Sequence, residues 1–451
     1  MLLLLLSSIL LILAFPNFNL SYLIFIGFIP LFSAIQNKSP KKAFLISYIS
    51  GFLFYLGTLY WLYHVTVIGL FVLCLYLALY FGVFGLIFSR CPMRYALCAM
   101  PFVWAVLEWI QSNLFGGFGW ALLGYSQYKN LPLIQVADFS GVYGVSFLII
   151  MINSAIYRAM KKSFREIIMS AIILTMALSY GFLRLNEKNG EEAIKISVVQ
   201  GNIPQEEKWD PGNSEYILDR YANLTRAASE DGPDLIVWPE TSFPGFLFID
   251  RMLTDEIMYI TNEINTPLLL GANTEEDLKS FNSAVLLSPG KDFPDKYDKI
   301  HLVPFGEYVP FSDSFPLLRR LVLGEFGEFT AGKEFKIFDL EDKDLKMKVD
   351  FAVLICFEDI FPELAREFVR RGARFLVIIT NDAWYGRSGA PYQHAACSVF
   401  RAIENRIPVV RCANTGYSCF IDSKGRIYDS VKENKTNLFI TGYKTSDIIL
   451  R

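Results

Sequence analysis

The feature that most constrains this 451-residue chain is the uneven distribution of its charged residues. The chain contains 45 Asp and Glu and 42 Lys and Arg residues, but only 13 of these lie in the first 183 positions. A segment so poor in charge cannot cover the surface of a soluble helical bundle with polar side chains. The first 183 residues are therefore predicted to lie in a membrane, and the remainder to form a soluble part.

Seven apolar segments in the first half approach the length of a membrane span, which requires about 20 apolar residues. The first segment ends at Pro16 and lacks a basic start and a small-residue cleavage site, so we interpret it as a span and not as a removable signal peptide. We expect about seven spans, at residues 2–15, 18–36, 43–63, 66–88, 95–113, 142–158 and 165–183.

The short loops between these segments differ in their Lys and Arg content. Loops 37–42, 89–94 and 158–165 together contain nine such residues, whereas the intervening connections contain only Lys129. Loops rich in Lys and Arg remain on the cytoplasmic side of a membrane. Everything after Leu183 is therefore predicted to lie on the opposite side.

Glu108 is an acid deep within an apolar segment, where an unpaired carboxylate would be costly. One interpretation is a helix-packing hydrogen bond with Gln111 or Ser112, and the other is a role in a substrate cavity. The Gly-Gly-Phe-Gly run at 116–119 predicts a helix break near the outer face, which a membrane tolerates only against protein or water.

From residue 193 onward, short apolar runs alternate with amphipathic stretches. Apolar runs rich in β-branched residues and separated by helices are typical of strands buried on both faces in layered α/β proteins. The expected strands are 195–200, 234–238, 267–271, 282–288, 348–355, 374–380, 408–413 and 417–421, and the expected helices are 213–230, 251–264, 361–371 and 392–406. The predicted organisation is a multi-span α-helical membrane domain (1–183), a polar joint (184–194) and an α/β catalytic domain (195–451).

Three reactive side chains are associated with these strands. Glu240 follows the strand 234–238, Cys356 follows the strand 348–355, and Lys299 lies in a loop too apolar to be a solvated surface. Chemistry in layered α/β proteins gathers beyond the carboxyl ends of strands. A thiol, a carboxylate and an ammonium could together perform covalent acyl transfer through a thioester.

The predicted surroundings of these groups suggest how they would ionise. Backbone amides and a following helix would favour the thiolate of Cys356, and burial would raise the pKa of Glu240. Taken singly, however, the three residues have ordinary interpretations: a buried small apolar side chain, a loop carboxylate and a surface lysine. Spacing alone does not establish that they meet.

The order Glu–Lys–Cys and the long motifs around it resemble the apolipoprotein N-acyltransferase family of the carbon–nitrogen hydrolase (nitrilase) superfamily. The resemblance covers nearly the whole chain. The motifs that carry it are LEWIQSNLFGGFGWALLGYSQ (107–127), VVQGNIPQEEKWD (198–210), IVWPET (236–241), YDKIHLVPFGEYVP (297–310), ICFED (355–359), TNDAWYG (380–386) and RAIENRIPVVRCANTGYS (401–418).

This resemblance implies an αββα sandwich for the second half and a role for each motif residue. Glu240 would be the general base, Lys299 would stabilise the oxyanion, and Cys356 would be the nucleophile. Glu307 would position Lys299 and assist it. The residues that would line or support the substrate pocket are Trp209, Phe357, Glu358 and Trp384.

The resemblance also implies a reaction and a location. An acyl chain would pass from a phospholipid, through the cysteine thioester, to the α-amino group of the diacylglyceryl-cysteine at the N-terminus of a bacterial apolipoprotein. The protein would be a monomer in the bacterial inner membrane, with its catalytic domain on the periplasmic side. The net charge of −3 gives no reason to expect nucleic acid, and neither a metal nor a cofactor is expected because the three histidines share no ligand spacing.

Three features depart from the usual pattern of the family. Phe357 stands where Tyr is expected, Gln111 stands where Arg is more common, and the chain ends at Arg451 without a final apolar span. We therefore expect no hydroxyl contribution at position 357, no contact with a lipid phosphate from position 111, and a C-terminus on the external side.

Two further points have alternative interpretations. The apolar segments 242–253 and 315–329 could either dip into lipid or pack into the domain core. Cys397, Cys412 and Cys419 could be buried thiols or could form a disulfide, which the external compartment would permit.

Two other functions compete with lipid-dependent acyl transfer. A membrane-tethered amidase or nitrilase would use the same three residues with water as the acceptor. A non-catalytic transporter or scaffold would carry an inactive hydrolase domain, although the intact Glu240, Lys299 and Cys356 argue against this alternative.

Overall fold

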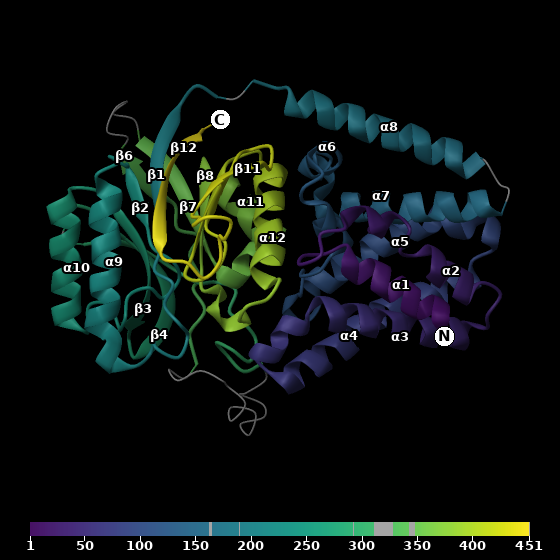
Figure 1. The fold of residues 1–451 in the computed structure, drawn as a ribbon, viewed down its shortest axis with the longest axis horizontal. Helices are drawn as coiled ribbons and strands as arrows, with labels where there is room; N and C mark the ends of the chain where they lie inside the picture. The colour runs from purple at the N-terminus through teal and green to yellow at the C-terminus, as the bar shows by residue number, and fades with distance from the viewer. Residues whose placement is uncertain (162–164, 189, 292, 311–327, 342–347, 451) are drawn as a thin grey trace. The chain divides into compact units, whose positions relative to one another are not determined.

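The computed structural model describes residues 1–161, 165–188, 190–291, 293–310, 328–341 and 348–450. The described chain forms two compact units (Figure 1). The helical unit comprises Met1–Lys188 and Tyr385–Glu404, and the α/β unit comprises Asn189–Trp384 and Asn405–Arg451. The helical unit thus includes the segment 385–404, which lies far along the chain from its other part.

The helical unit contains a helix within each of the seven apolar segments, together with α12 from the second half of the chain. Its longer helices are α1 (Leu2–Leu13), α2 (Ile29–Ile35), α3 (Pro40–Thr58), α4 (Val67–Arg90), α5 (Met93–Asn113), α7 (Ala137–Met160), α8 (Arg165–Leu185) and α12 (Ala390–Asn405). Its short helical turns are η1 (Ser21–Phe25), η2 (Tyr60–His64), η3 (Leu114–Gly116), η4 (Leu123–Gln127) and α6 (Leu131–Ile134).

Three helices within the described residues have both the length and the apolar composition of a membrane span: Val67–Arg90, Ala137–Met160 and Ile167–Leu185. Shorter apolar helices occur at Leu2–Leu13 and Ser21–Ile35, the second of which is divided into η1 and α2. The expected spans 43–63 and 95–113 correspond to α3 and α5, which are 19 and 21 residues long. The total of about seven spans stays a prediction.

The predicted helix break follows α5, where Phe115, Gly116 and Gly117 all have positive φ angles. A Cβ atom on Gly117 would lie 2.0 Å from the Ser112 carbonyl oxygen, so this tight return requires glycine. Glu108 stabilises the break because its Oε1 accepts the backbone N–H of Leu123, beyond the break, at 2.8 Å.

The partners of Glu108 differ from those that the sequence suggested. Its carboxylate accepts the indole N–H of Trp104 at 2.9 Å, whereas Ser112 donates to the backbone carbonyl of Glu108. Gln111 instead accepts from the Tyr55 hydroxyl and donates to the Phe118 carbonyl. The expected hydrogen bond with Ser112 therefore forms with the Glu108 backbone, while the carboxylate has Trp104 and Leu123 as partners, and a role in a substrate cavity stays a prediction.

Helix α12 contributes a buried polar side chain, Gln393, to the helical unit. Its Oε1 accepts the indole N–H groups of Trp61 and Trp120 at 3.1 and 3.0 Å. Its Nε2 donates to the carbonyls of Pro16 and Thr58 at 2.9 and 3.0 Å. One amide therefore satisfies four polar groups from three separate stretches of the unit.

The C-terminal part of α12 carries a buried ion pair between Arg401 and Glu404, whose Nη2 and Oε2 atoms lie 2.9 Å apart. Arg401 also donates to the Tyr125 hydroxyl at 3.1 Å. Oε1 of Glu404 accepts the backbone N–H of Val142 at 3.1 Å, just after Gly141 interrupts α7 with a φ of 63°. Glu404 therefore caps the helix that restarts after this interruption, where an anion is favoured.

The α/β unit consists of two six-stranded sheets, with strand orders β12-β1-β2-β3-β4-β5 and β11-β10-β9-β8-β7-β6. The first sheet contains β1 (Ala193–Gln200), β2 (Leu235–Val237), β3 (Leu268–Glu276), β4 (Lys279–Leu287), β5 (Asp295–Asp298) and β12 (Gly442–Ile449). The second contains β6 (Phe338–Glu341), β7 (Lys348–Ile355), β8 (Phe375–Thr380), β9 (Val409–Ala413), β10 (Cys419–Ile421) and β11 (Ile427–Ser430).

The central strands of each sheet are parallel, and the outer strands are antiparallel. Strands β1, β2 and β3 pair in parallel in the first sheet, as do β7, β8 and β9 in the second. The sheets face one another, because the Cys412 thiol on β9 donates to the carbonyls of Val199 on β1 and Val237 on β2 at 3.3 and 3.2 Å. Cys412 is thus a buried thiol, as are Cys397 and Cys419, so the disulfide alternative is wrong.

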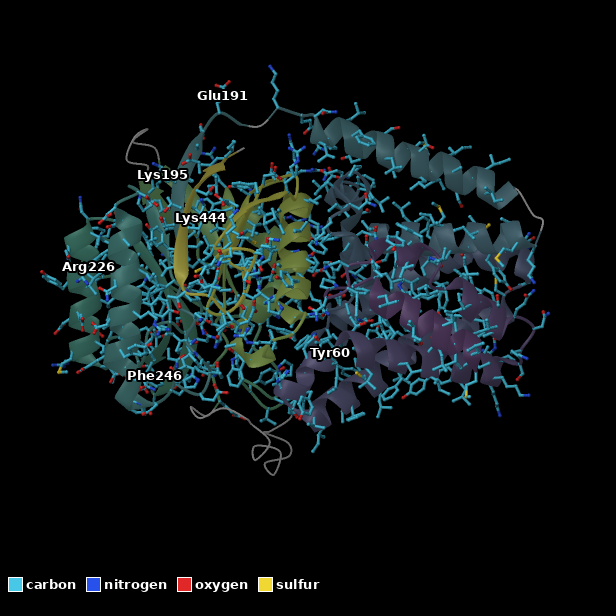
Figure 2. All side chains as sticks on the ribbon, in the orientation of Figure 1. Tyr60, Glu191, Lys195, Arg226, Phe246 and Lys444 are labelled. Carbon is cyan, nitrogen blue, oxygen red and sulfur yellow. The ribbon has the colours of Figure 1, made fainter. Side chains whose placement is uncertain are left out.

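Helices cover the outer faces of the two sheets. Helices α9 (Ser214–Ser229) and α10 (Arg251–Ile264) lie side by side against the first sheet (Figure 1). They enclose a core that includes Ile217, Tyr221 and Trp238, and Arg226 lies on their outer face, where it pairs with Glu263 (Figure 2). Helix α11 (Pro362–Arg370) packs on β7. The layered α/β fold with two sheets was correctly predicted.

The edge strands account for most of the differences from the expected strands. Strands β5, β6 and β11 are only four residues long and lack a marked apolar run. The last strand, β12, begins at Gly442, beyond all of the strands expected from the sequence. Its pairing with the full length of β1 supplies the stabilisation that its sequence does not reveal.

Candidate active site

Glu240 is positioned by the backbone that leaves β2 at its carboxyl end. Gly271 on the neighbouring strand β3 makes this path possible, because a Cβ atom there would lie 2.5 Å from the Thr241 nitrogen and 2.6 Å from the Glu240 Cα. Thr241 adopts a φ of 46°, in the left-handed region. The sharp turn leaves the Glu240 side chain only 6% exposed.

The Glu240 carboxylate has donors on both of its oxygens. Oε1 accepts from Asn282 Nδ2 at 2.9 Å and pairs with Lys299 Nζ at 3.4 Å, and Oε2 accepts the Asn381 backbone N–H at 2.9 Å. Burial alone would raise the pKa of Glu240, but Lys299, Asn282, Lys208 and the Asn381 amide together lower it. The expectation of a raised pKa was therefore wrong, because it neglected these donors.

Lys299 follows β5 and is 1% exposed, in agreement with the apolar character of its loop. Its Nζ lies 2.9 Å from Glu307 Oε1 as well as 3.4 Å from Glu240 Oε1. Burial opposes the charge on Lys299, but the two carboxylates outweigh that effect and raise its pKa. Lys299 is therefore a permanent ammonium held between two acids.

Glu307 is fixed at both of its carboxylate oxygens. Oε1 receives the ion pair with Lys299 and a hydrogen bond from Asn282 Nδ2 at 2.8 Å, and Oε2 accepts the Val303 backbone N–H at 2.7 Å. The side-chain amide of Asn282 therefore bridges Glu240 and Glu307. The backbone carbonyl of Asn282 also accepts the N–H of Lys299 at 2.9 Å.

Cys356 is the first residue after β7 and begins the short helical turn η7 (Cys356–Ile360). Its φ of 53° is unusual for a residue other than glycine, and such backbone conformations concentrate at functional sites. The side chain is 5% exposed. Burial, together with the negative charge of Glu240, raises the pKa of the Cys356 thiol, although Lys299 acts in the opposite direction. The expectation that the turn would favour a thiolate was wrong, because burial and Glu240 outweigh the effect of Lys299.

Glu358 is fully buried and ties together the segments that carry Cys356 and Lys299. Its Oε2 accepts the Ile355 N–H at 2.8 Å. Its Oε1 accepts the N–H groups of Ile300 and His301 at 2.8 and 3.1 Å, and the Tyr297 hydroxyl at 2.8 Å. Burial raises the pKa of Glu358 to about 7, and the donors limit this rise. Glu358 therefore supports the site by joining the backbone before Cys356 to the backbone after Lys299.

The aromatic residues expected around the pocket differ in exposure. Trp384 is 40% exposed, and Trp209 is half-buried beside the Lys208 ammonium, which lies 5.7 Å from the centre of its ring. Phe357 is 7% exposed and contacts Phe361 edge to face. Phe357 is thus part of the packing behind the turn.

A buried ion triad holds the turns after β7 and β8. Arg411 on β9 pairs with Asp359 at 3.3 Å and with Asp382 at 3.1 Å. Asp359 belongs to the turn that begins with Cys356, and Asp382 follows Asn381, whose amide binds Glu240. The second sheet thereby fixes two turns of the site at once.

Sequence reasoning missed three residues that the structure brings into this cluster: Lys208, Asn282 and Asn381. Asn381 could have been found, because it directly follows the predicted strand 374–380, where site residues are expected. Asn282 lies within an antiparallel strand, and Lys208 lies in an irregular segment. Neither follows the carboxyl end of a parallel strand, so the location that predicts site residues in α/β proteins does not apply to them. The segment 242–253 has a mixed character, since Phe243 and Leu247 are buried while Phe248, Ile249 and Met252 are exposed. The segment 315–329 lies almost entirely outside the described residues.

Family models match both parts of the chain. A family model described as carbon-nitrogen hydrolase matches residues 195–449, and one described as apolipoprotein N-acyltransferase N-terminal domain matches residues 7–155. Among solved structures, a Saccharomyces cerevisiae member of branch 10 of the nitrilase superfamily matches with a TM-score of 0.42 and 17% identity, over 58% of this chain and 92% of that chain.

Curated relatives extend the similarity to both units. The apolipoprotein N-acyltransferase of Geobacter metallireducens is 41% identical over 449 residues, which cover 94% of this chain and 85% of the relative. That of Chlorobaculum tepidum is 34% identical, over 94% and 87% of the two chains. The chain therefore belongs to the apolipoprotein N-acyltransferase family of carbon–nitrogen hydrolases.

Proposed function

We propose that this protein is an apolipoprotein N-acyltransferase that acts by a ping-pong mechanism through a thioester on Cys356. The acyl donor is a phospholipid, and the acceptor is the α-amino group of the diacylglyceryl-cysteine of an apolipoprotein. The observation that carries this proposal is the buried Lys299 held between Glu240 and Glu307, next to a cysteine in a left-handed turn. Family membership supports the choice of substrates.

The first half-reaction forms the acyl-enzyme. Cys356 Sγ attacks the ester carbonyl carbon of the phospholipid while its proton passes to Glu240. Since the pKa of the thiol is raised and that of Glu240 is lowered, this proton moves only as the new C–S bond forms. The C–O bond then breaks, and Glu240 returns the proton to the leaving lysophospholipid oxygen.

Lys299 stabilises the oxyanion of the tetrahedral intermediate. An ammonium has three N–H donors, and the contacts with Glu240 and Glu307 use two of them. We assign the third donor to the oxyanion. Glu307 keeps Lys299 charged and fixed in place, so that this stabilisation requires little reorganisation.

The second half-reaction transfers the acyl chain to the amine. The neutral α-amino group attacks the thioester carbonyl, Glu240 takes a proton from the nitrogen, and the C–S bond breaks. The departing sulfur takes the proton back from Glu240, which regenerates the resting site. The new bond is an amide, and the product is a triacylated lipoprotein.

The membrane context follows from the substrates. Both the phospholipid and the lipid-anchored acceptor reside in a bilayer, which explains why a hydrolase fold is joined to apolar helices. The distribution of Lys and Arg in the loops supports an orientation with the α/β unit on the periplasmic side of the bacterial inner membrane. We propose that the protein acts there as a monomer.

Labelling of the purified full-length protein by phospholipid tests the proposal. Incubation with a phospholipid that carries a labelled acyl chain is expected to attach the label to Cys356, as located by mass spectrometry, and hydroxylamine is expected to release it. Cys356→Ala abolishes the label, whereas Cys98→Ala, which removes an exposed thiol of the helical unit, leaves it unchanged. Hydrolysis of small amides without any lipid labelling would instead establish an amidase.

A further inference from the structure

Lys208 is a buried cation beside the active site to which the proposed mechanism gives no role. It is 4% exposed, and its Nζ donates to the backbone carbonyl of Glu240 at 3.0 Å. The neighbouring Glu206 and Glu207 on its own segment are exposed. Burial of an ammonium costs free energy, so a lysine buried against the Glu240 peptide is expected to have a function.

The charged groups that act on Lys208 come from two strands of different sheets. They are Glu240 after β2, whose carboxylate favours the ammonium, and Cys356 after β7, which favours the ammonium whenever its thiol is ionised. Burial nevertheless dominates and lowers the pKa of Lys208 to about 7. Lys208 therefore gains and loses its charge near neutral pH while it is hydrogen-bonded to the Glu240 backbone and within electrostatic reach of Cys356.

Interactions between titrating groups are reciprocal. If the Cys356 thiolate stabilises the Lys208 ammonium, the ammonium stabilises the thiolate to the same extent. The Lys208 ammonium likewise contributes to the lowered pKa of Glu240. The charge of Lys208 thus affects both ends of the proton transfer, and its hydrogen bond fixes the backbone from which Glu240 extends.

We propose that Lys208 is a positioning residue that holds the Glu240 backbone and, through its own protonation, sets the reactivity of Cys356. The inference rests on the proposed function because it assumes that Cys356 is the nucleophile. It adds a second cation to the site, distinct from Lys299, which remains charged throughout the neutral range. The charge on Lys208 makes the reactivity of the Cys356 thiol depend on pH.

Alkylation of Cys356 by iodoacetamide tests this inference without any lipid substrate. The reagent reacts with the thiolate, so the rate of alkylation is proportional to the fraction of Cys356 that is ionised. The rate is measured by mass spectrometry from pH 5.5 to 9 for the natural chain and for the variants Lys208→Met and Lys208→Arg. Methionine lacks the charge at every pH, and arginine keeps it at every pH.

The two variants are expected to give parallel curves, with the arginine variant faster by roughly tenfold, which corresponds to a change of about one unit in the pKa of the thiol. The natural chain should follow the arginine curve below about pH 6 and cross to the methionine curve above about pH 8. Glu358 also titrates near neutral pH, but its inflection would persist in both variants. Only Lys208 accounts for the crossing.

Coincident curves for the two variants would overturn the inference, as would a natural chain that runs parallel to one variant throughout. A merely structural role lowers all rates without producing a crossing. Because the assay needs no acyl donor, a crossing without lipid labelling would retain the role of Lys208 and reject the proposed acyl transfer. If one variant does not fold, the natural chain and the remaining variant still show either the crossing or parallel curves.

Discussion

Replacement of Lys299 by methionine tests how strongly the buried charge cluster holds the α/β unit together. The two ion pairs have separations of 2.9 and 3.4 Å. At an effective dielectric constant of about 20, they correspond to attractions of about 6 and about 5 kcal/mol. Loss of the ammonium also removes the cost of burying it, so the net loss is about 3–5 kcal/mol, as for other buried ion pairs broken from one side.

The expected destabilisation depends on pH, and the sign follows from the carboxylates that remain. Without Lys299, the buried Glu240 loses the ammonium and still lies close to Glu307, to which Asn282 joins it, so the pKa of Glu240 rises above the ordinary range. An acid whose pKa is raised in the folded state favours folding at low pH and disfavours it as pH increases through that value. The deficit of Lys299→Met should therefore be larger at pH 8 than at pH 5.5.

The measurement is thermal unfolding of the detergent-purified full-length protein, followed by circular dichroism at both pH values. For a unit of this size, about 1 kcal/mol corresponds to roughly 2–4 °C, so the midpoint at pH 8 should fall by about 10 °C. Lys299→Met combined with Glu307→Gln removes one of the two acids and should recover much of the loss. A decrease below about 2 °C, or one equal at both pH values, would refute this account of the cluster.

Substitutions at three other positions test separate parts of the structure. Gln393→Leu leaves two indole N–H groups and two carbonyls without their partner, so it should destabilise the helical unit by about 3 kcal/mol. The measurement is the midpoint of thermal unfolding, followed by tryptophan fluorescence. Gln393→Glu, which keeps the acceptor, should lower this midpoint less. Gly271→Ala forces a Cβ atom against the Glu240 backbone, so the rate of acyl-enzyme formation should fall at least tenfold, and an unchanged rate would disprove the need for glycine. Burial lowers the pKa of Lys208 to about 7, so the free energy of unfolding should increase as the pH rises from about 7 toward the ordinary pKa of lysine. Lys208→Met should abolish this increase, and an equal pH dependence in both proteins would contradict the expectation.

The sequence predicted those parts of the protein that depend on local pattern. Helix α10 was expected at 251–264 and begins and ends at those residues, because an amphipathic repeat determines its length. Strands β7 and β8 were likewise found, since continuous β-branched runs are typical of buried parallel strands. Long apolar or amphipathic elements thus carry their own signal.

The ionisation of the site could not be predicted, because it depends on contacts between distant segments. Glu240 and Asn282 are 42 residues apart, and Glu240 and Asn381 are 141 residues apart. The sequence indicated burial, which raises the pKa of an acid, but it did not reveal these donors. The membership of α12 in the helical unit was missed for the same reason, since Gln393 meets Trp61 across 332 residues.

The contribution of α12 to the helical unit has a consequence for biosynthesis. The ribosome completes Lys188 long before it reaches Tyr385, and at about 5–20 residues per second the delay is roughly 10–40 s. During this interval the nascent bundle lacks the glutamine that satisfies its two tryptophans. Completion of the helical unit must therefore wait for the synthesis of α12, and a polypeptide released early would present unsatisfied polar groups to quality-control proteases.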